Sequence, residues 1–276
     1  MAHATACKTH LGGCVLQKRC LGKTNILVSV MGLGTVKWGR NQAVKYPVSF
    51  SLPSDQEIKN LLSCASDLGI NLLDTAPAYG VSEERLGKLL SGSRKNWVIS
   101  TKVGEEFVDG QSQFHFSSDA IFGSIERSLK RLQTDYLDIV LVHSDGEDLR
   151  LIEEEQVFET LHLLKKAGKI RAYGMSTKTI LGGMRTIDLA DVAMVTLNKT
   201  QQEESQVIAY ANQHQKGIFI KKALLSGHLQ IISSEDPVTE AMHFVFEKPG
   251  VTSVIVGTIN PLHLQENAEK MLKVLA

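Results

Sequence analysis

The sequence predicts an α/β protein that folds as a closed (β/α)8 TIM barrel with an N-terminal β-hairpin at its bottom. Short runs rich in β-branched residues alternate with longer stretches of helical period, and there are eight of each. The 276 residues are close to the roughly 250 that such a barrel typically has. A doubly wound open sheet is the alternative, but its G-x-G-x-x-G turn is absent, because Gly32 and Gly34 are followed by glycine only at Gly39.

The expected strands follow in chain order. Two extended runs at residues 16–19 and 26–28, joined by a turn that contains Gly22, predict the hairpin that closes the bottom of the barrel. The eight barrel strands are expected at residues 30–33, 70–73, 97–101, 136–142, 170–174, 192–196, 218–221 and 253–256.

The intervening helices carry start and stop signals. Ser54 and Glu57 have the spacing of a capping box, and Lys165 and Lys166 stand in the last turn before Gly168, where cations suit the helix dipole. Helices are expected at residues 55–68, 84–90, 120–132, 153–167, 179–189, 201–215, 236–247 and 262–272. The longest expected loops are residues 37–53 and 104–118.

The composition is that of an ordinary globular protein. Hydrophobic residues make up 43% and charged residues 22%, which excludes a disordered chain. Because 30 Lys and Arg balance 30 Asp and Glu, bulk charge predicts no nucleic-acid partner. No apolar run reaches the roughly 20 residues of a transmembrane helix, so no membrane partner is expected. Four cysteines are too few for a disulfide framework, which favours a cytoplasmic protein.

Residues 1–14 are expected to form a flexible tail, and residues 15–276 a single barrel domain. All charges before Asp55 are basic, so a transit peptide is one alternative for this region. His3, Cys7, His10 and Cys14 have a spacing that a zinc site could use. An untethered terminus is the commoner explanation for such a segment, and no metal site is expected.

Three of the expected strands end at an ionisable residue. Asp74, Lys102 and His143 each follow an apolar run, and Tyr79 comes five residues after Asp74 in a short loop. Each residue alone has an ordinary explanation in capping or packing. In a barrel of this kind, however, the carboxyl ends of the strands form the active-site rim. We therefore expect these four side chains to converge there.

The same segments resemble motifs of a known family. DTAPAYG at residues 74–80, STK at 100–102, LDI at 137–139 ahead of His143, and GKIRAYGMS at 168–176 are similar to the aldo-keto reductases. The resemblance extends from about residue 16 to residue 272. It implies a (β/α)8 barrel that uses NADP(H), or NAD(H), to reduce aldehydes and ketones. It also implies that Asp74, Tyr79, Lys102 and His143 are the catalytic residues.

The chemistry of these four residues can be argued without the family. A carbonyl that accepts hydride becomes an alkoxide and needs a proton. A free tyrosine, with a pKa of about 10, is a weak acid, but a neighbouring ammonium such as that of Lys102 lowers the pKa. Asp74 can hold that ammonium in an ion pair. Tyr79 would then be the general acid, and His143 would donate to the carbonyl oxygen.

The resemblance also implies a set of cofactor-binding residues. Ser176 matches the serine that binds the carboxamide of nicotinamide, whereas Thr177, Met194 and Lys222 stand where the family has asparagine, glutamine and a stacking aromatic residue. The remaining positions belong to the rim, the pyrophosphate loop and the adenosine end: Gly34, Thr35, Asp74, Ala223, Leu225, Gly227, Gly257, Thr258, His263, Glu266 and Asn267. Because Gly257 and His263 replace basic residues, only a modest preference for NADPH over NADH is expected.

Three functions are compatible with the sequence. The first is a reductase, or the reverse dehydrogenase, that acts on a small-molecule carbonyl or alcohol. The second is a Schiff-base aldolase with Lys102 or Lys221 as the nucleophile, which leaves Tyr79 and His143 unexplained. The third is a cofactor-binding regulatory protein with little turnover, which the intact catalytic residues disfavour.

Overall fold

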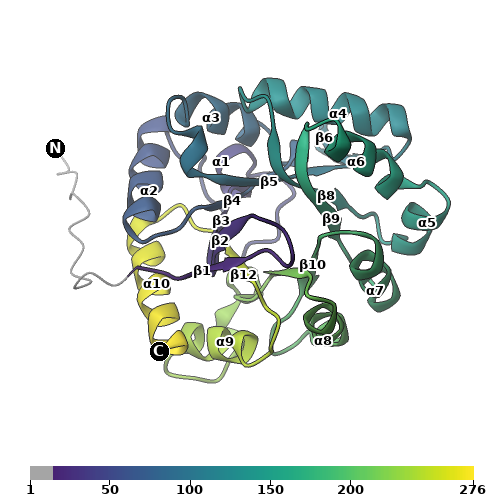
Figure 1. Ribbon diagram of the computed structural model, residues 1–276. Helices are drawn as coiled ribbons and strands as arrows, with labels where there is room; N and C mark the ends of the chain where they lie inside the picture. The colour runs from purple at the N-terminus through teal and green to yellow at the C-terminus, as the bar shows by residue number, and fades with distance from the viewer. Residues whose placement is uncertain (1–14) are drawn as a thin grey trace.

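A computed structural model describes residues 15–276, and its centre is a closed barrel of eight parallel strands (Figure 1). The strands follow one another around the barrel in chain order, and pairing of Met31 with Val254 closes it. The prediction of a (β/α)8 barrel is confirmed. The barrel strands are β3 (Met31–Gly34), β4 (Leu72–Asp74), β5 (Val98–Val103), β8 (Leu137–His143), β9 (Ile170–Ser176), β10 (Val192–Thr196), β11 (Gly217–Lys221) and β12 (Ser253–Val256).

The expected hairpin closes the amino-terminal end of the barrel. Strands β1 (Lys18–Cys20) and β2 (Leu27–Ser29) pair antiparallel, and Leu21, Ile26 and Val28 pack into the cluster of side chains that fills the barrel interior. Gly217 at the start of β11 makes room for this contact, because a Cβ atom there would lie 2.3 Å from Cδ1 of Leu21.

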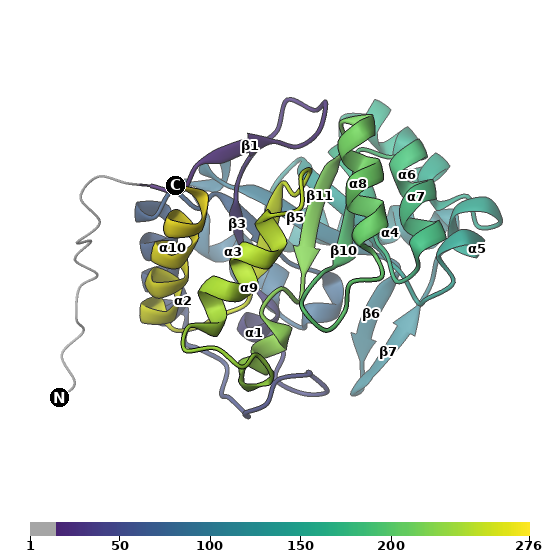
Figure 2. The same cartoon turned by 90° about the horizontal axis from the view of Figure 1, so that it is seen from below.

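The helices surround the barrel (Figures 1 and 2). The capping box is present, since the Ser54 hydroxyl accepts from the Glu57 amide and the Glu57 carboxylate accepts from the Ser54 amide. The longer helices are α2 (Asp55–Asp67), α3 (Ser82–Leu89), α4 (Ser118–Arg131), α6 (Val157–Lys166), α7 (Ile180–Leu189), α8 (Ser205–His214), α9 (Pro237–Phe246) and α10 (Pro261–Leu275).

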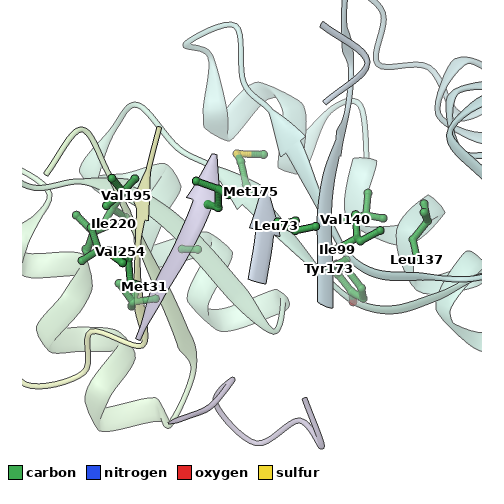
Figure 3. Close-up of a cluster of buried hydrophobic side chains, with 14 of the residues drawn as sticks. Met31, Leu73, Ile99, Leu137, Val140, Tyr173, Met175, Val195, Ile220 and Val254 are labelled. Carbon is green, nitrogen blue, oxygen red and sulfur yellow. The ribbon is translucent and has the colours of Figure 1, made fainter. Parts of the chain in front are cut away.

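The main hydrophobic core lies between the barrel wall and these helices. Successive strand residues face opposite sides of the wall: Leu72 belongs to the interior cluster, whereas Leu73 packs in the outer core. Met31, Leu73, Ile99 and Ile220 are among the strand side chains of this outer core drawn in Figure 3. Ile58 of α2 packs against the same layer.

Three features depart from the sequence predictions. The helix expected at residues 153–167 is α6, which begins only after Gln156 with its left-handed backbone (φ 51°), and a separate helix, α5 (Asp148–Glu153), precedes it where no helix was expected. The loop expected at residues 104–118 contains a hairpin of β6 (Glu105–Val108) and β7 (Gln111–Phe114). The loop expected at residues 37–53 begins inside a short helix, α1 (Val36–Gly39). Four 3-10 turns complete the elements: η1 (Pro77–Tyr79), η2 (Arg94–Asn96), η3 (Leu225–Gly227) and η4 (Leu229–Ile231).

Residues 15–276 lack candidates for a membrane-spanning helix and for a metal-binding cluster. None of the helices there is long and apolar enough to cross a membrane, and no cluster of His, Cys, Asp or Glu in that range could hold a metal ion. The expected tail, and the alternative zinc site in it, lie outside the described residues.

Candidate active site

The fold brings the four predicted catalytic side chains together at the carboxyl end of the barrel. Asp74 and His143 are the last residues of β4 and β8, Lys102 lies near the end of β5, and Tyr79 ends η1. The Lys102 ammonium lies 4.9 Å from the centroid of the Tyr79 ring. The rings of Tyr79 and His143 meet edge to face, with their centroids 6.4 Å apart.

Lys102 and Asp74 form a buried ion pair. The ammonium lies 2.8 Å from each carboxylate oxygen of Asp74 and donates to the carbonyl of Thr75 at 2.9 Å. The Ser100 hydroxyl donates to the same carboxylate at 3.1 Å. Burial by itself lowers the pKa of Lys102, but the charge of Asp74 and the interaction with Tyr79 outweigh it, so the pKa lies above its usual value. Lys102 is therefore a fixed cation rather than a free amine.

Two glycines position Tyr79 by allowing close approach of the backbone. A Cβ atom on Gly39 would lie 2.2 Å from the Tyr79 carbonyl oxygen, and one on Gly80, where φ is 61°, would lie 2.2 Å from the Gly39 carbonyl oxygen. Arg40 donates to the carbonyl of Ala78 at 3.1 Å. The main chain at the end of α1 is therefore in direct contact with the main chain of the turn that carries Tyr79, and this contact fixes the position of the turn.

The pKa of Tyr79 differs from the sequence expectation. Burial raises the pKa above its ordinary value, the Lys102 ammonium opposes that effect, and the Asp74 carboxylate adds to it. The expectation that Lys102 lowers the pKa was correct for that interaction and wrong for the net direction, because burial dominates. Tyr79 consequently keeps its proton at neutral pH, which suits a proton donor.

His143 has a carboxylate neighbour that the sequence analysis did not identify. Nδ1 of His143 lies 2.5 Å from Oε2 of Glu105, and the two side chains are 22% and 12% exposed. Burial lowers the pKa of His143, Glu105 raises it, and the charges of Lys102 and Lys221 lower it further. The net pKa lies below the usual value. Glu105 is 38 residues from His143 in sequence, and only the unpredicted β6–β7 hairpin brings it here.

On the nicotinamide side of the expected site, Lys221 rather than Lys222 reaches Ser176. The Lys221 ammonium donates to the Ser176 hydroxyl at 2.9 Å and to the Thr177 carbonyl at 2.6 Å. Burial lowers the pKa of Lys221 to about 8, against the opposing charge of Glu204. The sequence analysis aligned Lys222 with the family's stacking aromatic residue and named Lys221 only as an alternative nucleophile, so the contact of Lys221 with Ser176 was not predicted.

Thr177 and Met194 do not present polar groups to this site. The Thr177 hydroxyl donates to Glu204 at 2.6 Å, and Met194 packs in the apolar interior of the barrel. Thr35 is likewise directed inward, because its buried hydroxyl donates to the Asp74 carbonyl at 3.0 Å and accepts from Ser82 at 2.8 Å.

Glycines line the adjoining part of the rim. Gly34 ends β3 and Gly257 follows β12; a Cβ atom on Gly34 would lie 3.7 Å from Cα of Gly257. The segment after α1 packs over them, with the Tyr46 hydroxyl 3.2 Å from a Cβ placed on Gly257 and Pro47 at 3.3 Å from one placed on Gly227. At Gly34, Gly227 and Gly257 the absence of a side chain therefore lets neighbouring groups approach the main chain closely.

The residues expected to bind the pyrophosphate and the adenosine follow β11 and β12. Lys222 has a left-handed backbone (φ 58°), and Asn198 donates to its carbonyl at 3.1 Å. Burial lowers the pKa of Lys222, and the charges of Lys45 and Lys178 lower it further. Ala223 and Leu225 are buried. At the other end, Thr258 accepts from the Asn260 amide, and α10 carries exposed His263 and Glu266 and buried Asn267.

These residues fit a nicotinamide dinucleotide. Burial lowers the pKa of Lys222, and the positive charges of Lys45 and Lys178 lower it further; such a group of cations suits the charge of a pyrophosphate. The helix α10 begins beside Thr258, and helix amino termini favour phosphate. An acid, a buried cation and an imidazole converge at the opposite side of the rim, where a reacting carbonyl can be bound.

Comparisons with known proteins point to one family. The model of the Aldo/keto reductase family matches residues 30–240. Aldo-keto reductase YhdN of Bacillus subtilis is 31% identical over 221 residues, 76% of this chain, and the match spans 62% of that protein's length. L-galactose dehydrogenase of Arabidopsis thaliana is 35% identical over 167 residues, 58% of this chain and 48% of that protein. The crystal structure of PA4992 from Pseudomonas aeruginosa, assigned to the aldo-keto reductases, is 52% identical, with a TM-score of 0.87 over 95% of this chain and 98% of that one.

Proposed function

Because this chain belongs to the aldo/keto reductase family, we propose that it is an NAD(P)H-dependent oxidoreductase that reduces aldehydes or ketones to alcohols, or catalyses the reverse reaction. The observation that carries the proposal is the buried pair of Lys102 and Asp74 beside Tyr79 and His143. A bound nicotinamide cofactor would supply or accept the hydride. The substrate would be a small carbonyl compound or alcohol.

Each of the four side chains has a role that follows from its surroundings. Tyr79 gives its proton to the developing alkoxide oxygen, and its raised pKa keeps that proton in place beforehand. Lys102 stabilises the phenolate that remains, and Asp74 holds Lys102 in position through both carboxylate oxygens. His143 orients the carbonyl oxygen and polarises it.

We propose NADP(H) as the cofactor, with NAD(H) as the alternative. Ser176 would bind the carboxamide with Lys221 beside it, and Lys45, Lys178 and Lys222 would face the phosphates. The residues expected at the adenosine end supply little positive charge, because Gly257 and His263 stand where the family has basic residues. The preference for NADPH over NADH is therefore modest in this proposal.

The aldolase alternative is weak at Lys102, because a Schiff-base lysine must be an uncharged amine and Lys102 is held as an ammonium by Asp74. Lys221, whose pKa is about 8, is the remaining nucleophile for that alternative. Borohydride trapping in the presence of an aldehyde tests it. Covalent labelling of Lys221, together with no oxidation of NADPH, would favour the aldolase over the reductase.

Oxidation of NADPH, followed by absorbance with a panel of generic aldehydes, tests the reductase directly. Replacement Tyr79→Phe should reduce the rate by about 10²- to 10⁴-fold, the usual contribution of general acid catalysis, and leave cofactor affinity intact. The matched control is Tyr210→Phe, which removes a hydroxyl bonded to Asp188 on the helical surface. A Tyr79→Phe variant with more than roughly a tenth of the wild-type rate is incompatible with the role of Tyr79.

A further inference from the structure

We propose that Glu105 is a positioning residue that holds a proton on Nδ1 of His143 and thereby sets the protonation state in which Nε2 meets the substrate oxygen. The proposal deepens the carbonyl chemistry proposed above and rests on it. Glu105 itself does not touch the reacting atoms in this arrangement; it acts through His143.

The contact between the two residues is close and shielded. Oε2 of Glu105 lies 2.5 Å from Nδ1 of His143, and the two side chains are 12% and 22% exposed. The other carboxylate oxygen is already used, because the Ser112 hydroxyl donates to Oε1 at 2.5 Å across the hairpin. Glu105 therefore offers one free oxygen, and that oxygen faces the imidazole.

The hairpin that carries Glu105 is fixed to the rim. At its base Gly104 has a φ of 98°, and a Cβ atom there would lie 2.3 Å from the ring of Phe116, which is buried. The guanidinium of Arg40 lies over the ring of Phe107, 3.4 Å from its centroid. Arg40 also binds the turn that carries Tyr79. The carboxylate of Glu105 and the hydroxyl of Tyr79 are thus held by one connected set of contacts.

Among the charged groups around His143, Glu105 is the one that raises the pKa of the imidazole. Lys102 faces the imidazole from β5 and Lys221 from β11, and both lower its pKa; Tyr79 contacts it from η1, and Glu105 from β6 is the anion that raises the pKa. Burial first raises the pKa of Glu105, but His143, Ser112 and Arg40 together lower it to about 2. Glu105 is consequently an anion at every pH at which the protein would work.

An anion beside Nδ1 determines where the imidazole keeps its protons. When His143 is neutral, its single proton stays on Nδ1, and Nε2 is an acceptor, as the oxidation of an alcohol requires. When His143 takes a second proton, that proton is on Nε2, and Nε2 becomes a donor to a carbonyl oxygen. Without Glu105, the two lysines would keep the ring neutral and leave its tautomer unfixed.

Nitrogen NMR of the imidazole in the full chain, without cofactor, measures this effect directly. In Glu105→Gln the proton affinity of His143 should fall by about tenfold or more, because an opposite charge at this distance typically moves a pKa by at least one unit, and the fixed Nδ1–H tautomer should be lost. Glu106→Gln is the matched control: Glu106 is the next residue of β6 and pairs with Arg127 on the outside. Glu105→Ala repeats the test if the Gln variant does not fold.

Kinetics give a second measure that a purely structural role would not produce. In Glu105→Gln, the pH at which carbonyl reduction is half-maximal should fall by about one unit or more, which corresponds to at least a tenfold higher proton concentration. The affinity for the cofactor should not change. An unchanged tautomer and proton affinity of His143 in both Glu105 variants would overturn the role of Glu105 and leave the reductase proposal standing. Failure of the Tyr79→Phe test would instead overturn the reductase, whatever the NMR result.

Discussion

Replacing Asp74 by asparagine is expected to destabilise the folded protein strongly. The side chains of Lys102 and Asp74 are only 2% and 5% exposed, so the substitution leaves an ammonium buried without its counter-charge. The acceptors that remain are the Thr75 carbonyl at 2.9 Å and the amide oxygen of the new asparagine, and Tyr79 beside them is neutral at physiological pH because its pKa is raised. Two neutral carbonyls do not replace the counter-charge of a carboxylate around a buried cation.

The size of the effect follows from the burial of the pair. Removing one partner of a buried ion pair costs about 3–5 kcal/mol. For a protein of this size each kcal/mol changes the Tm by about 2–4 °C, so Asp74→Asn should lower the Tm by roughly 6–20 °C at pH 7. Adding Lys102→Met removes the unpaired charge, and the double variant should regain most of the lost stability.

Thermal unfolding followed by circular dichroism at pH 7 measures all three variants. Asp55→Asn is the matched control, because Asp55 pairs with Arg85 and Lys88 but is 37% exposed, and surface ion pairs contribute little. Its Tm should stay close to that of the wild type. A Tm drop of less than about 2 °C in Asp74→Asn, or a double variant less stable than the single one, would refute the reasoning.

Further predictions concern the rim. Gly39→Ala should displace the turn that carries Tyr79, because the new Cβ meets backbone at 2.2 Å; we expect a larger loss of kcat than of cofactor affinity, and normal kinetics would contradict the close packing. Lys221→Met should raise the free energy of unfolding below pH 8 by up to about 3 kcal/mol, because burial lowers the pKa of Lys221 in the folded protein to about 8, well below that of a free lysine. The wild type should recover that difference as the pH rises from 8 to 10.5, since there only the unfolded chain holds the proton; a constant difference in urea midpoints would count against it. Preference for NADPH over NADH should be modest, because Gly257 and His263 replace the family's basic residues; dissociation constants that differ by more than about a thousandfold would indicate another base.

The barrel and the place of three proposed catalytic residues could be predicted because both depend on local patterns. Asp74, Lys102 and His143 stand at the ends of apolar runs, and strand ends of a parallel barrel meet at one rim. Tyr79 was expected there because it closely follows one of these ends. The start of α6 only after Gln156 was missed because glutamine rarely adopts a left-handed backbone and leaves no signal of its own.

Glu105 could not be predicted because its role depends on tertiary placement. Asp109 and Gly110 form a recognisable hairpin turn, both with positive φ, but the strands beside it are short and largely polar and exposed, and lack the alternation that marks a half-buried strand. The contact of Lys221 with Ser176 was not predicted for a related reason. Lys221 ends β11 and Ser176 ends β9, and only the folded barrel brings these two strand ends together.

The hairpin of β6 and β7 forms a two-stranded sheet of its own, separate from the closed ring of barrel strands. No residue of the hairpin takes part in the pairing of β5 with β8. Glu105 belongs to this hairpin, so a change at this one position alters the surroundings of His143 without changing how the barrel strands pair. The pH response of the site and the architecture of the barrel are therefore encoded in separate parts of the chain.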